Sequence, residues 1–187
     1  MKNGFTLIEL MTTLAILAIV VAFGVPSFSS TIKNNRQSSQ LNTLISAINY
    51  ARTEAVKRND EHVVMCGSTD MSSCNTSNWE SGWIIFADTN NNGTRDSSEN
   101  ILRVNGSLSG GNTLRSSNFS SGSDILKFNT QGMLTSSGTF TLCDDRGATY
   151  ARALVVNVSG QARPASDEDS TPDSIVNDNN GANVSCP

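Results

Sequence analysis

The chain has 187 residues and a formal net charge of −4, and 37% of its residues are apolar and 16% charged. Ser, Thr and Asn, with 27, 17 and 21 residues, are abundant, and such residues favour turns and caps over long helical bundles. A catalytic triad or metal site that depends on histidine would have to use His62, the one histidine of the chain. The negative charge argues against a generally basic nucleic-acid binder. These averages hide an uneven pattern, because apolar residues gather near the N-terminus.

Residues 5–25 form an apolar run, FTLIELMTTLAILAIVVAFGV, that contains a single charged residue, Glu9. In a helix, a run of this length rises about 30 Å, which is the thickness of a bilayer core. Lys2 precedes the run, and positive charge stays on the cytoplasmic side of a membrane, so we expect the remainder of the chain to lie outside the cytoplasm. A cleaved signal peptide fits poorly, because Phe23 and Val25 stand where small residues should precede the cut. The pattern therefore predicts a membrane helix.

Glu9 is unusual, because a carboxylate in an apolar membrane helix costs about 2.5–3.5 kcal/mol and is usually paired. If the chain were cut after Gly4, the new α-amino group of Phe5 would be the nearest cation. The string Gly4-Phe5-Thr6-Leu7-Ile8-Glu9-Leu10 resembles the leader junction of type IV pilins and type II secretion pseudopilins. The resemblance implies that residues 1–4 are a leader removed by prepilin peptidase between Gly4 and Phe5, and that the Phe5 amine is then N-methylated. It also implies that Glu9 docks on the Phe5 amine of a neighbouring subunit.

Gly24 and Pro26 stand at the end of the apolar run and predict a kink, because proline removes one helical hydrogen bond and clashes with the preceding turn. Beyond the kink, residues 26–59 predict an amphipathic helix that continues into the globular domain. Its apolar residues recur at helical spacing: Leu41, Leu44, Ile45, Ile48, Ala51 and Ala55. We therefore expect one bent helix from Phe5 to Arg58.

From His62 onward the apolar residues recur with a period of two, which is typical of strands. No helix-length pattern separates the expected strands, so the sheet should be antiparallel. Residues 105–124 are expected to form a loop. The expected fold class is α+β, with the long helix packed on antiparallel sheets and residues 60–187 forming the β domain. The expected strands, each bounded by Gly, Ser, Asn or Asp, are His62–Cys66, Trp83–Ala87, Ile101–Val104, Ile125–Asn129, Thr139–Cys143 and Ala153–Val158.

Several longer strings extend the resemblance: ARTEAVKRN at 51–59, WESGWIIFAD at 79–88, FNTQG at 128–132, TFTLC at 139–143 and VNVSG at 156–160. Together they resemble the FimT/FimU–GspH family of minor pilins and pseudopilins. The resemblance implies the pilin fold and a structural subunit that helps to prime type IV pilus assembly. The implied partners are other minor and major pilins and an inner-membrane assembly platform. The implied precursor is a single-pass inner-membrane protein with a periplasmic C-terminus, which later joins a filament at the cell surface.

The sequence bears on three other functions. Minor pseudopilin H of type II secretion has the same architecture and stays open as an alternative. A DNA-binding minor pilin is a further alternative, since some FimT-like proteins carry a Gly-Arg-x-Arg motif. The matching string here, Gly160-Gln161-Ala162-Arg163, lacks one arginine, and phosphate binding needs clustered cations, so we do not expect a nucleic-acid partner. No nucleophile motif such as GxSxG is present, so we do not expect an enzyme.

The four cysteines suggest disulfides, because the chain is expected to lie in an oxidising compartment. Three pairings are possible. We expect Cys66 to pair with Cys74 across a short polar loop, and Cys143 with Cys186, since the second bond would pin a polar, acidic tail. A zinc site is the alternative, although the sequence lacks the CxxC spacing typical of such sites.

The segment from Asp88 to Glu99 satisfies the EF-hand pattern for calcium. The context differs, because strands rather than helices are expected on both sides, and Arg95 stands where an EF-hand usually has an apolar residue. A hairpin turn rich in Asn and Gly explains the same residues. We therefore expect no cofactor and keep calcium at this loop as an open alternative. The pattern residues are Asp88, Asn90, Asn92, Gly93 and Glu99.

Overall fold

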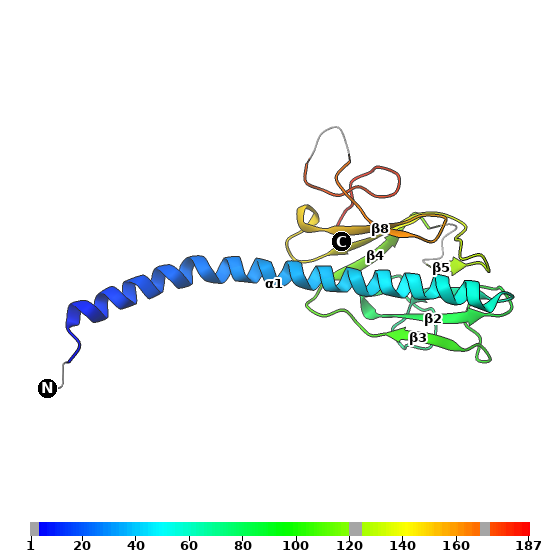
Figure 1. The fold of residues 1–187 in the computed structure, drawn as a ribbon, viewed down its shortest axis with the longest axis horizontal. Helices are drawn as coiled ribbons and strands as arrows, with labels where there is room; N and C mark the ends of the chain where they lie inside the picture. Colours follow the sequence, from blue (N-terminus) through cyan, green and yellow to red (C-terminus); the bar gives the residue numbers. More distant parts are fainter. Residues whose placement is uncertain (1–3, 120–124, 169–172) are drawn as a thin grey trace. The chain divides into compact units, whose positions relative to one another are not determined.

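The computed structural model describes residues 4–119, 125–168 and 173–187. The chain divides into two compact units, Met1–Ser39 and Gln40–Pro187. A single helix, α1 (Leu7–Arg58), runs through both, and all the described strands belong to the second unit (Figure 1).

The second unit contains two four-stranded sheets in which every neighbouring pair is antiparallel. The first sheet has the order β3-β2-β1-β5, and the second has the order β4-β6-β7-β8. Short 3₁₀ helices precede β2 and β7. In chain order the elements after α1 are β1 (His62–Gly67), η1 (Trp79–Ser81), β2 (Trp83–Asp88), β3 (Ile101–Asn105), β4 (Thr113–Ser117), β5 (Ile125–Phe128), β6 (Gly138–Cys143), η2 (Ala148–Tyr150), β7 (Arg152–Val156) and β8 (Ala162–Pro164).

The expected fold class is confirmed, and the predicted helix and all six predicted strands are present with ends shifted by at most two residues. The prediction of a loop over residues 105–124 was wrong, because Thr113–Ser117 forms β4 at the edge of the second sheet. Only Leu114 in this strand is apolar and buried, so the period-two pattern was too weak to detect. Residues 120–124 of that segment lie outside the described residues. Strand β8 was also missed.

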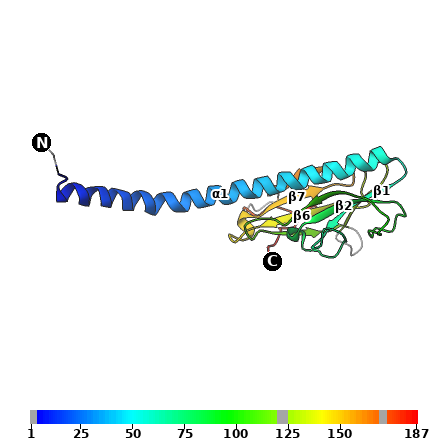
Figure 2. The same cartoon turned by 90° about the horizontal axis from the view of Figure 1, so that it is seen from below.

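The main core lies between α1 and the two sheets. Within the second unit, α1 runs along one side of both sheets (Figure 2). Alanines let the backbone of α1 approach closely, and Ala47, Ala51 and Ala55 are fully buried. Trp79 meets Phe140 edge to face with ring centroids 4.8 Å apart, a favourable arrangement of aromatic quadrupoles. The core also contains Leu44, Ile48, Met65, Trp83, Ile85, Leu126 and Phe128.

Each sheet buries its other face under a segment that a disulfide holds. The structure contains both expected pairs, Cys66–Cys74 and Cys143–Cys186. The first bond belongs to a cluster on the first sheet, formed by Val64, Cys66, Ile84 and Phe86 with Met71, Cys74 and Ile125. The second bond belongs to a cluster on the second sheet, formed by Cys143, Ala151, Ala153 and Val184 with Ala165, Ile175, Val176 and Cys186. Closing loops of this kind typically stabilises a fold by about 2–4 kcal/mol.

Two turns of the same construction lie in the strings FNTQG and VNVSG. In the first, the Gly132 N–H donates to the Asn129 carbonyl at 2.8 Å, and the Asn129 side-chain oxygen accepts the Gln131 N–H at 3.0 Å. In the second, the Gly160 N–H donates to the Asn157 carbonyl at 2.9 Å. Both glycines have φ of +73°, the left-handed region that glycine adopts without steric cost.

The two turns pack against each other and against α1. A Cβ atom on Gly160 would lie 2.5 Å from the Gly132 carbonyl oxygen and 3.2 Å from Cδ of Arg52. A Cβ atom on Gly132 would lie 2.9 Å from Cγ2 of Val56 and 3.0 Å from Cγ of Arg52. Glycine is therefore required at both positions by backbone conformation and by space.

An ion pair ties η1 to the edge of the second sheet. The Glu80 carboxylate pairs with the Arg115 guanidinium and accepts the Leu114 N–H at 3.2 Å. Burial alone would raise the pKa of Glu80, but the hydrogen bonds from Arg115 and from backbone N–H groups outweigh it and hold that pKa below its usual value. The pair therefore covers part of the outer edge of β4, which no strand covers in the described structure.

Candidate functional site

Helix α1 begins at Leu7, two residues later than predicted, because Thr6 caps it. The Thr6 hydroxyl accepts the Glu9 N–H at 3.3 Å, and the Thr6 carbonyl accepts the Leu10 N–H at 3.2 Å. A threonine followed three residues later by a glutamate is the start signal of a capping box. Gly4 and Phe5 consequently lie in exposed, non-helical backbone ahead of the helix.

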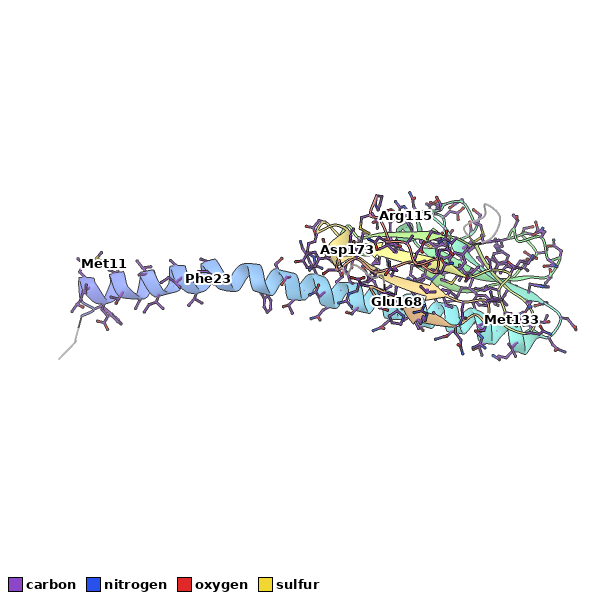
Figure 3. All side chains as sticks on the ribbon, turned by 90° about the horizontal axis from the view of Figure 1, so that it is seen from above. Met11, Phe23, Arg115, Met133, Glu168 and Asp173 are labelled. Atoms are coloured by element: carbon purple, nitrogen blue, oxygen red, sulfur yellow. A yellow bond between two sulfur atoms is a disulfide. The ribbon has the colours of Figure 1, made fainter. Side chains whose placement is uncertain are left out.

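Every described side chain of the apolar run is exposed. Phe5 is 85% exposed and Phe23 is 78% exposed, and Figure 3 shows Met11 and Phe23 among the side chains that project from the helix. The hydroxyls of Thr12 and Thr13 donate to helix carbonyls at 3.0 and 2.8 Å, so these two polar groups are satisfied within the segment. The helix is long and apolar enough to cross a membrane.

Glu9 occupies the third position of the helix and is exposed. Its backbone is capped by Thr6, but its carboxylate has no hydrogen bond or ion pair with residues 4–119, 125–168 or 173–187. A negative charge in the first turn is favourable with the helix dipole, although it does not replace an ionic partner in an apolar environment. The geometry thus presents one carboxylate in the first turn of a helix whose exposed side chains are mostly apolar.

The predicted kink at Gly24 and Pro26 stays a prediction. Helix α1 is continuous through both residues. The side chains of residues 24–27 lie outside the described part of the structure.

Hydrogen-bond donors of the chain itself already contact the carboxylates of the EF-hand-like segment from Asp88 to Glu99. Asp88 is fully buried, and its carboxylate accepts the Asn92 N–H at 3.0 Å and the Gly93 N–H at 2.9 Å. The Lys127 ammonium lies 3.1 Å from the same carboxylate and donates to the Asn91 carbonyl at 2.7 Å. A side-chain cation therefore lies beside the first carboxylate of the pattern.

The other ligand positions of this segment also bond within it. Glu99 accepts the Thr89 N–H at 2.8 Å and the Asp96 N–H at 3.0 Å. The side-chain amides of Asn90 and Asn92 both donate to Asp96, at 2.6 and 3.1 Å. In the described part of the chain, no three His, Cys, Asp or Glu side chains gather where they could hold a metal ion.

Arg95, which departs from the EF-hand pattern, bridges two loops. It donates to the Glu99 carbonyl at 3.1 Å and to the Ser72 carbonyl at 3.0 Å, inside the loop that the Cys66–Cys74 bond closes. In that loop the hydroxyl of Ser73 and the N–H groups of Ser72 and Ser73 lower the pKa of Asp70 far below its usual value. Residue spacing alone did not indicate this bridge.

The string Gly160-Gln161-Ala162-Arg163 begins at the second glycine turn and continues into β8. Arg163 is exposed, and its guanidinium lies 3.4 Å from the carboxylate of Glu168. The Ser166 hydroxyl and Arg163 together lower the pKa of Glu168. The arginine therefore has an anionic partner in its own chain, and the string does not form a cluster of cations.

Sequence comparison identifies the family. A family profile described as Type II transport protein GspH matches residues 40–160, which is more than half of the chain. The chain belongs to the GspH family. A second profile, described as Prokaryotic N-terminal methylation motif, matches residues 1–25 of this GspH family member. No curated protein sequence matches the chain.

Structural comparison finds solved structures with a similar fold. The type IV minor pilin FimU of Pseudomonas aeruginosa is similar to this GspH family member in two crystal forms, each with 21% sequence identity. One form gives a TM-score of 0.54 and covers 72% of this chain and 91% of FimU, and the other gives 0.51, 69% and 92%. The minor pseudopilin EpsH of Vibrio cholerae type II secretion gives a TM-score of 0.48 at 10% identity, covering 72% of this chain and 99% of EpsH.

The resemblance predicted from the sequence is therefore confirmed. The chain is a minor pilin or pseudopilin with the α+β pilin fold, and members of its family are structural subunits that assemble with other pilins or pseudopilins. The methylation motif and the apolar helix fit a membrane-anchored precursor. Sequence reasoning missed Lys127, the Arg95 bridge and the paired turns; only the turns had a visible signal, the repeated Asn-x-x-Gly at 129–132 and 157–160.

Proposed function

We propose that the chain is a minor pilin, a structural subunit of the type IV pilus that helps to prime pilus assembly. One observation carries the proposal: an exposed apolar helix presents a single carboxylate, Glu9, that pairs with none of the described residues, and the helix continues into a domain with the fold of FimU. Such a helix is unfavourable in water, because exposing contiguous large apolar side chains to water is costly, so the helix needs a membrane or a partner that covers it.

Maturation is the first step of the proposed function. Prepilin peptidase cuts between Gly4 and Phe5, and the new Phe5 amine is methylated. The bond lies in exposed backbone ahead of the Thr6 cap, so cleavage does not require the helix to unwind.

Docking is the second step. The Glu9 carboxylate of an incoming subunit pairs with the Phe5 amine of its neighbour. In a low dielectric both charges are costly alone and stabilised together, so the pair sets the axial register of the helices. The neighbours are other minor and major pilins, and the inner-membrane assembly platform delivers the subunit.

Localisation follows from the same features. The precursor spans the inner membrane once with its C-terminus in the periplasm, and both disulfides suit that oxidising compartment. Assembly then moves the apolar segment from lipid into the filament core, and the sheet domain faces the cell exterior.

We also propose that the loop from Asp88 to Glu99 folds without a divalent cation. The Lys127 ammonium supplies the positive charge beside the buried Asp88 carboxylate, and N–H groups satisfy Glu99. Calcium would have to displace this lysine and compete with those N–H groups.

Two alternatives share the architecture. A minor pseudopilin H would use the same helix and carboxylate in the type II secretion machine. A DNA-binding minor pilin is disfavoured, because Arg163 already pairs with Glu168.

Deletion of the gene tests the proposal. Piliation and twitching are measured in parallel with protein secretion, and a strain in which the unmodified gene is restored is the control. Loss of piliation with normal secretion is the expected result. Loss of secretion alone would contradict the pilus role and support the pseudopilin. Loss of DNA uptake with pili intact would support the DNA-binding alternative.

A further inference from the structure

Three exposed apolar residues of the second unit lie close together. Large apolar residues are exposed at five positions in its described part, and three of them, Val56, Met133 and Val158, are 50%, 41% and 44% exposed. Gly132 brings the first two together, because a Cβ there would lie 2.9 Å from Cγ2 of Val56, and Met133 follows it directly. The Val158 carbonyl accepts the Leu134 N–H at 2.8 Å. We call Val56, Met133 and Val158 the turn patch.

The turn patch has a rigid base. It is carried by the C-terminal part of α1 and by the two glycine turns, whose backbones meet so closely that no Cβ fits between them. Figure 3 places Met133 beside that end of α1. Because the backbone that carries these side chains is already fixed, a partner that covers them does not have to order the turns, and such preorganisation favours binding.

A cation, Arg52, lies beside the turn patch. The Arg52 stem packs on both glycine turns, with Cδ 3.2 Å from the position of a Gly160 Cβ. Its Nε is buried without a hydrogen-bond partner, and Arg52 forms no ion pair with the described residues. Neighbouring cations differ, because Lys57 pairs with Glu54 and Arg163 with Glu168. The patch is therefore complementary to an apolar surface that carries a carboxylate.

We propose that the turn patch docks the globular domain of another pilin subunit, which covers Val56, Met133 and Val158 with apolar side chains and pairs a carboxylate with Arg52. This inference rests on the proposed function as a filament subunit. It adds a second contact to the one at Glu9, on the same helix but in the folded domain. Nucleic acid fits less well, because a single guanidinium does not supply the clustered cations that phosphate binding needs, and Arg163 is already paired with Glu168.

Site-specific photo-crosslinking in assembling cells tests this surface with the full chain. A photoreactive amino acid replaces Val158, and matched chains carry it at Val104 or at Ile16. Val104 is a control of equal exposure outside the patch, 47% against 44%, and Ile16 reports assembly through the apolar helix. We expect pilin adducts from positions 158 and 16 and a much weaker signal from position 104.

The charge is tested in the chain labelled at position 158. Arg52→Met keeps the apolar stem and removes the charge, whereas Arg52→Lys keeps a charge. We expect the adduct yield to fall about tenfold with Arg52→Met and to persist with Arg52→Lys, the size of effect expected for a close interfacial charge pair. Unchanged thermal unfolding of the purified full-length variants in detergent shows that both fold.

The outcomes separate this inference from the function on which it rests. Pilin adducts at position 16 but not at position 158, or adducts at 158 that are nucleic acid or a protein other than a pilin, would overturn the docking proposal and leave the filament role intact. An unchanged yield with Arg52→Met would overturn it as well. Absence of pilin adducts at both positions would overturn the filament role, and the docking proposal with it.

Discussion

Substituting alanine for Gly160 tests the packing of the two turns. Gly160 has φ of +73°, and a Cβ there would lie 2.5 Å from the backbone carbonyl oxygen of Gly132. This oxygen belongs to a turn that is itself fixed by hydrogen bonds, so it cannot rotate away as the end of a flexible side chain would. The methyl group must push the turns apart or push the second turn away from α1.

The expected loss of unfolding free energy has two parts, and a matched control variant separates them. A left-handed conformation costs an alanine about 1–2 kcal/mol. Gly111 has φ of +70° and nothing within 4 Å of its Cβ position, so Gly111→Ala should show this cost alone. Gly160→Ala should add about 1–3 kcal/mol for overpacking. We therefore expect a total loss of about 2–5 kcal/mol at Gly160 and about 1–2 kcal/mol at Gly111.

Denaturant unfolding of the full chain in detergent, followed by tryptophan fluorescence, measures both losses, because Trp79 and Trp83 are buried in the core. The reasoning is refuted if Gly160→Ala and Gly111→Ala lose the same free energy of unfolding. A loss at Gly111 that exceeds the loss at Gly160 would contradict it more strongly.

Three further predictions concern the loops and sheets of the second unit. Lys127→Met leaves the buried Asp88 charge without its cation and should lower the free energy of unfolding by about 3–5 kcal/mol in denaturant unfolding. Calcium should leave the melting temperature of the unmodified chain unchanged. A calcium-dependent rise would contradict the proposal that the loop needs no divalent cation. Cys186→Ser should lower the free energy of unfolding by about 2–4 kcal/mol under non-reducing conditions, and no loss would mean that the tail is held without the bond. Glu80→Gln should lower the free energy of unfolding at neutral pH. A carboxylate with a lowered pKa stabilises the fold above the usual glutamate pKa of about 4.3, and this stabilisation is lost as the pH falls. A difference in unfolding free energy from the unmodified chain that persists at pH 2 would contradict the role of Arg115.

Elements with a strong apolar period were predictable from the sequence. Helix α1 follows from the helical spacing of Leu, Ile and Ala, and the central strands follow from short apolar runs that the sheets bury on both faces. The cap at Thr6 also has a signal in the sequence, because a threonine followed three residues later by a glutamate is typical of a helix start. Strand β4 was not, since Leu114 is its only buried apolar residue and pairing with β6 supplies the rest of its stability.

The position of Lys127 depends on strand register, which the sequence does not reveal. β5 pairs with β1 so that Lys127 lies opposite Val64, and β1 pairs with β2 so that Val64 lies opposite Phe86. Only these two registers together bring the lysine to Asp88, two residues beyond Phe86. A shift of one residue in either pairing would place the ammonium and the Asp88 carboxylate on opposite faces of the sheet.

The arrangement at Glu9 was predictable to a different extent. Composition alone identifies the single carboxylate in the apolar run, whereas its function depends on a second subunit. The structure adds that the carboxylate is exposed in the first turn of a capped helix and pairs with none of the described residues. The docking role therefore needs a measurement on the assembled filament.

That measurement is the amount of the chain in sheared, purified pili, compared between the unmodified protein and Glu9→Ala at equal levels in the membrane. Removing the carboxylate should not hinder membrane insertion, because it removes a cost of about 2.5–3.5 kcal/mol, so a loss from pili would reflect assembly. The account predicts that the unmodified chain is present in the pili and that Glu9→Ala stays in the membrane fraction. Equal amounts of both chains in the pili, or absence of the unmodified chain from them, would contradict it.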